Sequence, residues 1–167
     1  MLKISTQTIE FIKRWEGQRD KKTGKVVYCL NAYQCSSGVW TIGYGTTFYS
    51  DGRRVKEGDK INENDALFEL YKYIEKYCLP VIEDIEKQGV KLNENQKTAI
   101  SSLVYNIGAP AFNRSTCKKC IISGNVDGAC KNWDWFKSNG KILNGLIKRR
   151  NEEIYLMCGT KGYWCCK

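Results

Sequence analysis

Apolar side chains near the start of the chain are spaced as on one face of a helix. Within residues 5–15 they include Ile9, Ile12 and Trp15, which lie three positions apart. Residues 5 and 6 are Ser and Thr, types that cap helix N-termini, and Gly17 follows the last apolar position. The pattern predicts a short amphipathic helix over residues 5–15.

From residue 25 to residue 45 the pattern changes to β-branched and aromatic side chains interrupted by turn residues. The interruptions are Asn31, the Ser-Ser-Gly run at residues 36–38 and Gly43. A Ser-Asp-Gly turn signal follows at residues 50–52. Short runs of this kind are typical of strands joined by tight turns, so we expect a small antiparallel sheet here.

Helical spacing returns after residue 62 and persists almost to the end of the chain. Helices are expected at residues 63–80, 93–107, 126–137 and 144–158. The first of these is expected to end at Pro80, since proline interrupts helices. Asn93 and Gln96 have the spacing of a capping box, and Gly159 stands where a left-handed cap is preferred.

This order of elements predicts an α+β fold. A chain of 167 residues has the size of one domain, so we expect a single domain over residues 1–167. Its sheet lobe is expected at about residues 17–60, and its helical lobe at about residues 80–167 together with the N-terminal helix. A long helix would join the lobes and leave a cleft between them, where ligands commonly bind.

The amino-acid composition limits which catalytic mechanisms and binding partners are possible. The chain has no histidine, which excludes Ser-His and Cys-His nucleophilic catalysis and histidine-ligated metals. It carries 27 Lys and Arg against 18 Asp and Glu, a formal net charge of +9. That charge favours an anionic partner such as nucleic acid, anionic lipid or an anionic cell wall. Because the basic residues are dispersed rather than clustered, nucleic acid binding is not expected.

The nine cysteines are many for a protein kept in a reducing compartment. Cys117 and Cys120 have the spacing of zinc ligands, but without histidine and without a second such pair the set of four ligands is incomplete. Structural disulfides or buried thiols are therefore favoured over zinc. The odd count leaves at least one cysteine unpaired in a monomer, and the other eight are enough for complete pairing.

Glu16 is the first candidate for chemistry. It stands at the expected end of the first helix, where the helix dipole disfavours ionisation, and it follows Trp15, whose bulk helps to exclude water. A carboxyl kept protonated is what general acid catalysis needs. For an isolated glutamate a solvated helix end is the simpler interpretation, but the motifs that follow reverse that preference.

Residues 32–47 read AYQCSSGVWTIGYGTT, in which Cys35 precedes Thr41 of a T-I-G-x-G strand by five intervening residues. Together with Glu16-Gly17, this segment resembles the phage-type lysozymes, glycoside hydrolase family 24, whose pattern is a catalytic Glu, then Asp or Cys, then Thr. Further matches are LNENQ at residues 92–96, SLVYNIG at residues 102–108 and LNGLIKRR at residues 143–150. The resemblance extends from the first helix to Gly159.

The resemblance implies a lysozyme-like fold and a muramidase that hydrolyses the β-1,4 bond between N-acetylmuramic acid and N-acetylglucosamine in peptidoglycan. It implies that Glu16 is the general acid and that Thr41 holds the attacking water. Cys35 stands where many relatives have Asp. Its role stays open between orienting water, acting as a thiolate base, bonding the sugar briefly and pairing in a disulfide that silences the site.

Substrate contacts are expected at Gly43, Gly45, Thr46 and Asn106. The two glycines would let the backbone approach the glycan closely, although tight strand positions would explain them as well. Either Arg149 or Arg150 is expected to pair with Glu16, the alternative being a solvated basic patch.

Two features depart from the family pattern. The spacing from Glu16 to Cys35 holds 18 residues, more than is usual, so residues 20–30 are expected to form an inserted hairpin or loop beside the cleft. Thr46 replaces a histidine that often follows the T-I-G-x-G segment, which removes a supporting group rather than the catalytic ones.

The resemblance also implies a monomer that acts on bacterial peptidoglycan without metal or other cofactor. The sequence has no run of about 18 apolar residues, and its start lacks the apolar stretch of a secretion signal. We therefore expect synthesis in the host bacterial cytoplasm and action in the periplasm or cell wall after release. The alternative function is a catalytically weak peptidoglycan-binding protein with the same fold.

Overall fold

The computed structural model describes residues 3–19, 26–27, 29–35, 38–138, 140–161 and 163–164. The strands are β1 (Gln18–Arg19), β2 (Val26–Val27), β3 (Cys29–Gln34), β4 (Trp40–Gly43), β5 (Lys137–Ser138) and β6 (Lys141–Ile142). The helices are α1 (Thr6–Glu16), α2 (Glu63–Tyr73), α3 (Leu79–Lys87), α4 (Glu94–Ile107), α5 (Ala109–Asn113), α6 (Thr116–Ile122), α7 (Val126–Lys131) and α8 (Asn144–Cys158), with the π-helical turn η1 (Ile74–Cys78) between α2 and α3.

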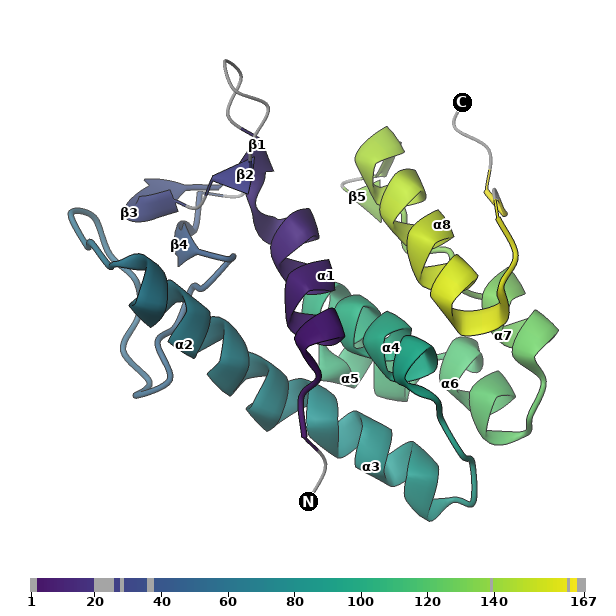
Figure 1. Cartoon of the computed structure of the whole chain (residues 1–167). Coiled ribbons are helices and arrows are strands. Elements are labelled where there is room, and N and C mark those ends of the chain that lie inside the picture. Colours follow the sequence, from purple (N-terminus) through teal and green to yellow (C-terminus); the bar gives the residue numbers. More distant parts are fainter. Residues whose placement is uncertain are drawn as a thin grey trace.

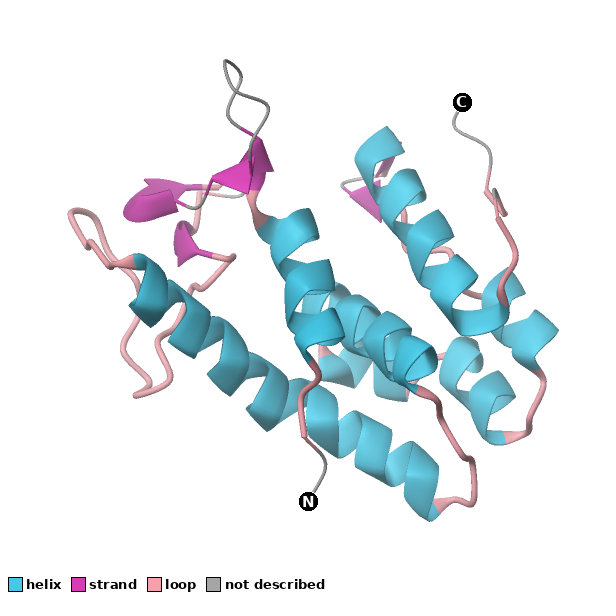
Figure 2. Ribbon diagram, viewed as in Figure 1, coloured by secondary structure: helices cyan, strands magenta, loops and turns pink. Residues whose placement is uncertain are grey.

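Strands β1 to β4 gather at one end of the molecule, and helices form most of the rest (Figures 1 and 2). Helices α2 and α3, joined by η1, form one long continuous helix from the sheet end to the opposite end of the molecule (Figure 1). Helix α1 packs beside α4. The α+β fold expected from the sequence is confirmed.

Helix α1 forms because its start is capped and its inner face is buried. The Ser5 hydroxyl accepts a hydrogen bond from the Thr8 N–H at 3.2 Å. Ile12 is fully buried, and the Thr8 hydroxyl lies 2.9 Å from the Thr98 hydroxyl of α4. These contacts fix α1 against α4, and the helix ends at Glu16.

In the described part of the sheet lobe, the expected small sheet is present as two separate antiparallel pairs, β1 with β2 and β3 with β4. A further pair, β5 with β6, lies before α8 and was not predicted from the sequence. In the β3–β4 hairpin Tyr33 pairs with Thr41. The hairpin closes at Cys35, whose N–H donates to the Val39 carbonyl at 3.0 Å. The expected insertion at residues 20–30 lies largely outside the described residues, and β1 and β2 pair on either side of its first part.

The connecting helix is longer than the sequence pattern predicted. It passes through η1 into α3 and ends at Lys87, so the expected end at Pro80 is wrong. Pro80 lies in the first turn of α3, a position that tolerates proline, and the π-helical turn precedes it. Beyond the proline, Val81 and Ile85 remain buried and continue the apolar face.

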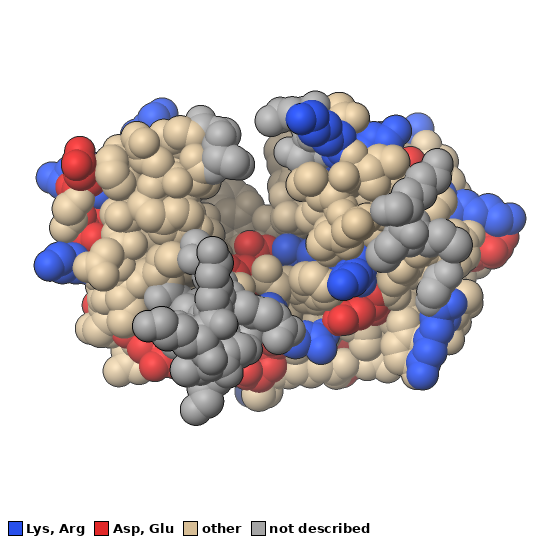
Figure 3. All heavy atoms as spheres, turned by 90° about the horizontal axis from the view of Figure 1, so that it is seen from above, with Lys and Arg blue, Asp and Glu red and all other residues tan. Residues whose placement is uncertain are grey.

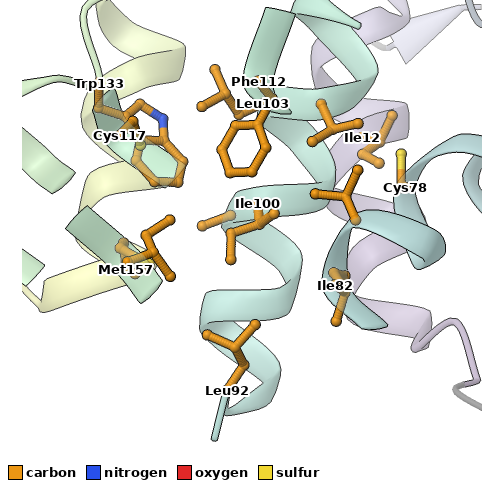
Figure 4. Close-up of a cluster of buried hydrophobic side chains, with 14 of the residues drawn as sticks. Ile12, Cys78, Ile82, Leu92, Ile100, Leu103, Phe112, Cys117, Trp133 and Met157 are labelled. Carbon is orange, nitrogen blue, oxygen red and sulfur yellow. The ribbon is translucent and has the colours of Figure 1, made fainter. Parts of the chain in front are cut away.

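Helix α4 forms the centre of the core. Its capping box is present as predicted, because the Asn93 side chain accepts from the Gln96 N–H at 2.9 Å and the Gln96 side chain accepts from the Asn93 N–H at 3.1 Å. Figure 4 shows the apolar side chains around this helix, which include Ile12, Cys78, Ile82, Ile100, Leu103, Phe112, Cys117, Trp133 and Met157. Helices that precede α4 in the chain and helices that follow it therefore pack around one core.

The helix expected at residues 126–137 ends early, at Lys131. A loop then turns Trp133 into the core, where its side chain is fully buried. The apolar residues after Lys131 thus belong to this loop and not to the helix. The short helices α5 and α6 were not predicted, because five and seven residues give little periodicity. Helix α8 spans Asn144–Cys158 as expected, and Gly159 follows it with a φ of 78°.

A hollow separates two parts of the surface when the molecule is viewed from above (Figure 3). It agrees with the cleft expected between the sheet lobe and the helical lobe. Among the described residues, the helices are all too short or too polar to cross a membrane.

Shortening a core side chain of α4 is expected to destabilise the whole molecule. Leu103 is fully buried, so Leu103→Ala should lower the free energy of unfolding by about 2–5 kcal/mol through lost burial and a new cavity. Leu67→Ala is the matched control, because that leucine is exposed on α2. Urea unfolding of both variants measures the difference, and similar losses would contradict the central place of α4.

Candidate active site

Glu16 is the last residue of α1 and lies at the boundary between the helical and sheet lobes. Its side chain is 18% exposed. Its Oε1 accepts a hydrogen bond from Nη1 of Arg149 on α8 at 2.6 Å. The sequence left the choice between two arginines open, and the structure assigns the contact to Arg149.

The Arg149 guanidinium is held on several sides. It is 3% exposed, its Nε donates to Glu153 Oε1 at 3.1 Å, and its Nη2 donates to the Ser102 carbonyl at 3.1 Å. Burial alone would lower the pKa of Arg149, but the carboxylates of Glu16 and Glu153 raise it above the ordinary value. The arginine therefore presents a fixed positive charge to Glu16.

Glu153 is fully buried and joins these groups into one network. Its Oε1 accepts from the Ser102 hydroxyl at 2.6 Å and its Oε2 from the Trp133 indole N–H at 2.9 Å. Arg150 donates to Oε1 through Nη2 at 2.9 Å, and its Nε lies 2.7 Å from Oε2. Sequence reasoning missed this residue, although its i+3 and i+4 spacing from the two arginines on a predicted helix was a usable signal.

Besides Glu153, Arg150 binds two groups that Arg149 does not contact. Its Nη1 donates to Asn106 Oδ1 at 3.0 Å and to the Trp135 carbonyl at 3.1 Å. Burial lowers the pKa of Arg150, despite its ion pair with Glu153. Asn106 is exposed but its side-chain oxygen is engaged by this arginine. Substrate binding by Asn106 stays a prediction.

Gly45 brings the sheet lobe close to the second oxygen of Glu16. The glycine has a φ of +89°, and a Cβ placed on it would lie 3.5 Å from Glu16 Oε2. Gly43 differs, since a Cβ there would lie 3.1 Å from the Cβ of Ala66 on α2. The missing side chain at Gly43 thus serves the packing of β4 on α2, and a glycan contact there stays a prediction.

Cys35 and Thr41 occupy the same hairpin and share a partner. The Thr41 hydroxyl donates to the Val39 carbonyl at 3.0 Å, and the Cys35 N–H donates to the same carbonyl, also at 3.0 Å. Thr41 is 5% exposed. Because a hydroxyl that donates once can still accept, Thr41 keeps the capacity to receive a hydrogen bond from water.

A pocket of about 550 Å³ adjoins Gly45 and lies between the loop that follows β4 and the helical segment formed by α2 and η1. Its lining residues include Gly45, Thr46, Phe48, Tyr49, Glu69, Lys72, Tyr73, Glu75, Lys76 and Tyr77. The sequence prediction placed Thr46 at the site but missed the aromatic wall, whose residues come from segments that meet only in the fold.

Two tyrosines connect this pocket to the core. The ring centres of Tyr73 and Tyr105 are 4.6 Å apart, and the Tyr105 hydroxyl donates to the Tyr44 carbonyl at 2.6 Å. Burial raises the pKa of Tyr73 to about 12, so its ring carries no charge near neutral pH. The segment before Gly45 is thereby tied to α4.

Comparison with known proteins agrees with this geometry. Residues 13–153 match the family described as phage lysozyme. An endolysin of Acyrthosiphon pisum secondary endosymbiont phage 1 is 39% identical over 155 residues, which cover 90% of this chain and 94% of the relative. A solved endolysin of Escherichia coli O157:H7 phage FAHEc1 is 30% identical, with a TM-score of 0.69 and 96% of each chain covered.

A second solved structure, the muramidase domain of SpmX from Asticaccaulis excentricus, is 32% identical, with a TM-score of 0.72, 95% of this chain and 99% of that chain covered. The α+β fold matches those of the lysozyme-like endolysins, which defines the class of protein as a glycoside hydrolase. The chain belongs to the phage lysozyme family and is a lysozyme-type glycoside hydrolase.

Removing the charge of Glu153 is expected to destabilise the fold strongly. Glu153→Gln removes the carboxylate that pairs with buried Arg150 and leaves buried Arg149 with Glu16 alone, which should lower the free energy of unfolding by about 3–5 kcal/mol. The adjacent Glu152 is half-exposed and binds Arg14 and Trp15 at the surface, so Glu152→Gln should cost about 0–1 kcal/mol. Denaturant unfolding tests both, and equal losses would contradict the role given to Glu153.

Proposed function

We propose that this enzyme hydrolyses the β-1,4 bond between N-acetylmuramic acid and N-acetylglucosamine in bacterial peptidoglycan, with Glu16 as general acid. The observation that carries the proposal is the arrangement around Glu16. One carboxyl oxygen is held by Arg149, and the other lies beside Gly45 of the sheet lobe. A carboxyl fixed in this way presents one oxygen to a bound substrate.

The surroundings of Glu16 suit proton transfer to a leaving sugar. A proton carried on Oε2 passes to the glycosidic oxygen as positive charge develops on the muramic sugar. The carboxylate that remains is stabilised through Oε1 by the Arg149 guanidinium, which is already in place. Little reorganisation is therefore needed as the negative charge appears.

The second half of the reaction is assigned to the β3–β4 hairpin. Thr41 accepts a hydrogen bond from the attacking water while its own O–H donates to the Val39 carbonyl. Cys35, which directly follows β3 in the same hairpin, orients that water or removes its proton. Glycosidases that activate water in this way use a second group placed across the sugar from the acid.

The aromatic pocket beside Gly45 is proposed to hold sugar units of the glycan strand. It begins at the segment that faces Glu16, and it combines aromatic rings with carboxylate and ammonium groups. Apolar walls with a few polar groups are typical of ligand sites. Thr46 and Gly45 line it and contact the glycan in this proposal.

The net charge of +9 favours approach to the anionic wall. We propose that the protein acts there as a monomer after release from the host cytoplasm, with residues 1–167 as a single lysozyme-like domain. The alternative, a catalytically weak wall-binding protein, would keep the pocket but would not need the Arg149 contact to Glu16.

Replacing Glu16 by glutamine tests the assignment of the acid. Glu16→Gln removes the transferable proton and the charge that pairs with Arg149, while its amide oxygen can still accept from Arg149, and it should lower the release of reducing ends from purified peptidoglycan by about 10²–10⁴-fold. Glu10→Gln is the matched control, because Glu10 lies exposed on the same helix and pairs only with Lys13 among the described contacts. Undiminished activity of the Glu16 variant would overturn the assignment of Glu16 as general acid.

Exchanging the hairpin residues tests the water site. Cys35→Asp should keep substantial activity and resist thiol reagents, because a carboxylate serves the same water, whereas Cys35→Ala and Thr41→Ala should each lose most activity. Cys29→Ala, on the same hairpin, controls for loss of a thiol. Reducing-end release from peptidoglycan is the measurement, and a Cys35→Ala enzyme as active as the parent would remove Cys35 from the mechanism.

A further inference from the structure

Two cysteines far from the cleft lie within reach of each other. The Sγ atoms of Cys130 on α7 and Cys158 on α8 are 3.1 Å apart, although the residues are 28 positions apart in sequence. Cys130 is buried, whereas Cys158 is exposed at the last position of α8. Both carry thiols in the structure.

Neither thiol serves the network around Glu16. The Cys158 Sγ donates to the Ile154 carbonyl of its own helix at 3.3 Å, and the Cys130 thiol donates to Cys158. By contrast, the Cys78 thiol is fully buried on the other side of the core and donates to the Ser101 carbonyl. Cys165 and Cys166 lie outside the described residues, so complete pairing of the eight cysteines other than Cys35 stays a prediction. Among the described cysteines, Cys130 and Cys158 have their sulfur atoms in contact.

We propose that Cys130 and Cys158 form a disulfide when the protein meets a small-molecule or protein disulfide that acts as oxidant. Each thiol loses one proton and one electron as the S–S bond forms. The donor disulfide accepts the two electrons and the two protons and leaves as two thiols. The side chains need only a small approach, since their sulfur atoms are already in contact.

The two cysteines have different parts in the exchange. Cys158 is exposed, so its thiolate attacks the donor disulfide first, releases one donor thiol and holds the other half as a mixed disulfide. Cys130 then attacks the Cys158 sulfur and releases the second donor thiol. Burial and the neighbouring Cys158 raise the pKa of the Cys130 thiol, which makes it a poor first attacker but leaves it beside the mixed disulfide.

The bond would join the end of α8 to α7. It closes a loop that contains Trp133, both strands β5 and β6 and the part of α8 that carries Arg149. Closing a loop of this size restricts the unfolded chain, so oxidation should raise the melting temperature by about 5–15 °C. The segment closed by this bond carries Arg149, which binds Glu16.

The test compares the full chain and three variants, Cys130→Ser, Cys158→Ser and Cys120→Ser, before and after incubation with oxidised glutathione. Cys120→Ser is the matched control, because it removes a half-buried thiol from neighbouring α6. Peptide mapping of the oxidised parent should find Cys130 linked to Cys158. The rise in melting temperature should vanish in the first two variants and persist in the control.

The order of attack has its own readout in the same samples. Cys130→Ser should accumulate glutathione on Cys158, while Cys158→Ser should leave Cys130 unmodified. The proposal is overturned if Cys130 and Cys158 remain alkylatable in the oxidised parent, or if both serine variants keep the full rise in melting temperature. Glutathione on Cys130 in Cys158→Ser would reverse the order of attack.

Discussion

The buried contact between Glu153 and the two arginines that precede it on α8 sets the position of much of the structure. Taking three charges out of water is costly, and the cost is offset only where each charge meets well-placed partners. Those partners come from separate elements, namely Ser102 on α4, Trp133 in the loop after α7 and Glu16 at the end of α1. The network therefore orders these elements relative to one another while it holds the guanidinium that binds Glu16.

Helices with local signals were predictable, because those signals act within a few residues. The Ser5 cap, the Asn93 capping box and the Gly159 end are all such signals, and the structure contains each of them. The errors arose where distant contacts decide the outcome. Pro80 does not end its helix because a π-helical turn precedes it, and Trp133 leaves the helical pattern because its indole has a buried partner on α8.

The candidate site was predictable in its residue types and less so in its contacts. Family resemblance supplied Glu16, Cys35 and Thr41, and the structure places the latter two in one hairpin, with Thr41 on β4 and Cys35 directly after β3. Adjacent positions on a helix differ by about 100° in direction, so sequence alone does not say whether Arg149 or Arg150 reaches a residue on another helix. The aromatic pocket could not be predicted from the sequence either, because its two walls come from separate segments of the chain.

The two carboxyl oxygens of Glu16 have different surroundings, so the two sides of the carboxyl are not equivalent. Oε1 is bound to an arginine whose raised pKa keeps it charged throughout the pH range of enzymes, so that side of the carboxyl has a constant partner. Oε2 faces a glycine, where any side chain would stand between the carboxyl and the sheet lobe. In the proposed mechanism, Oε2 is therefore the oxygen that exchanges a proton with substrate. The helical lobe fixes Glu16, and the sheet lobe leaves room beside its carboxyl and supplies the hairpin that carries Cys35 and Thr41.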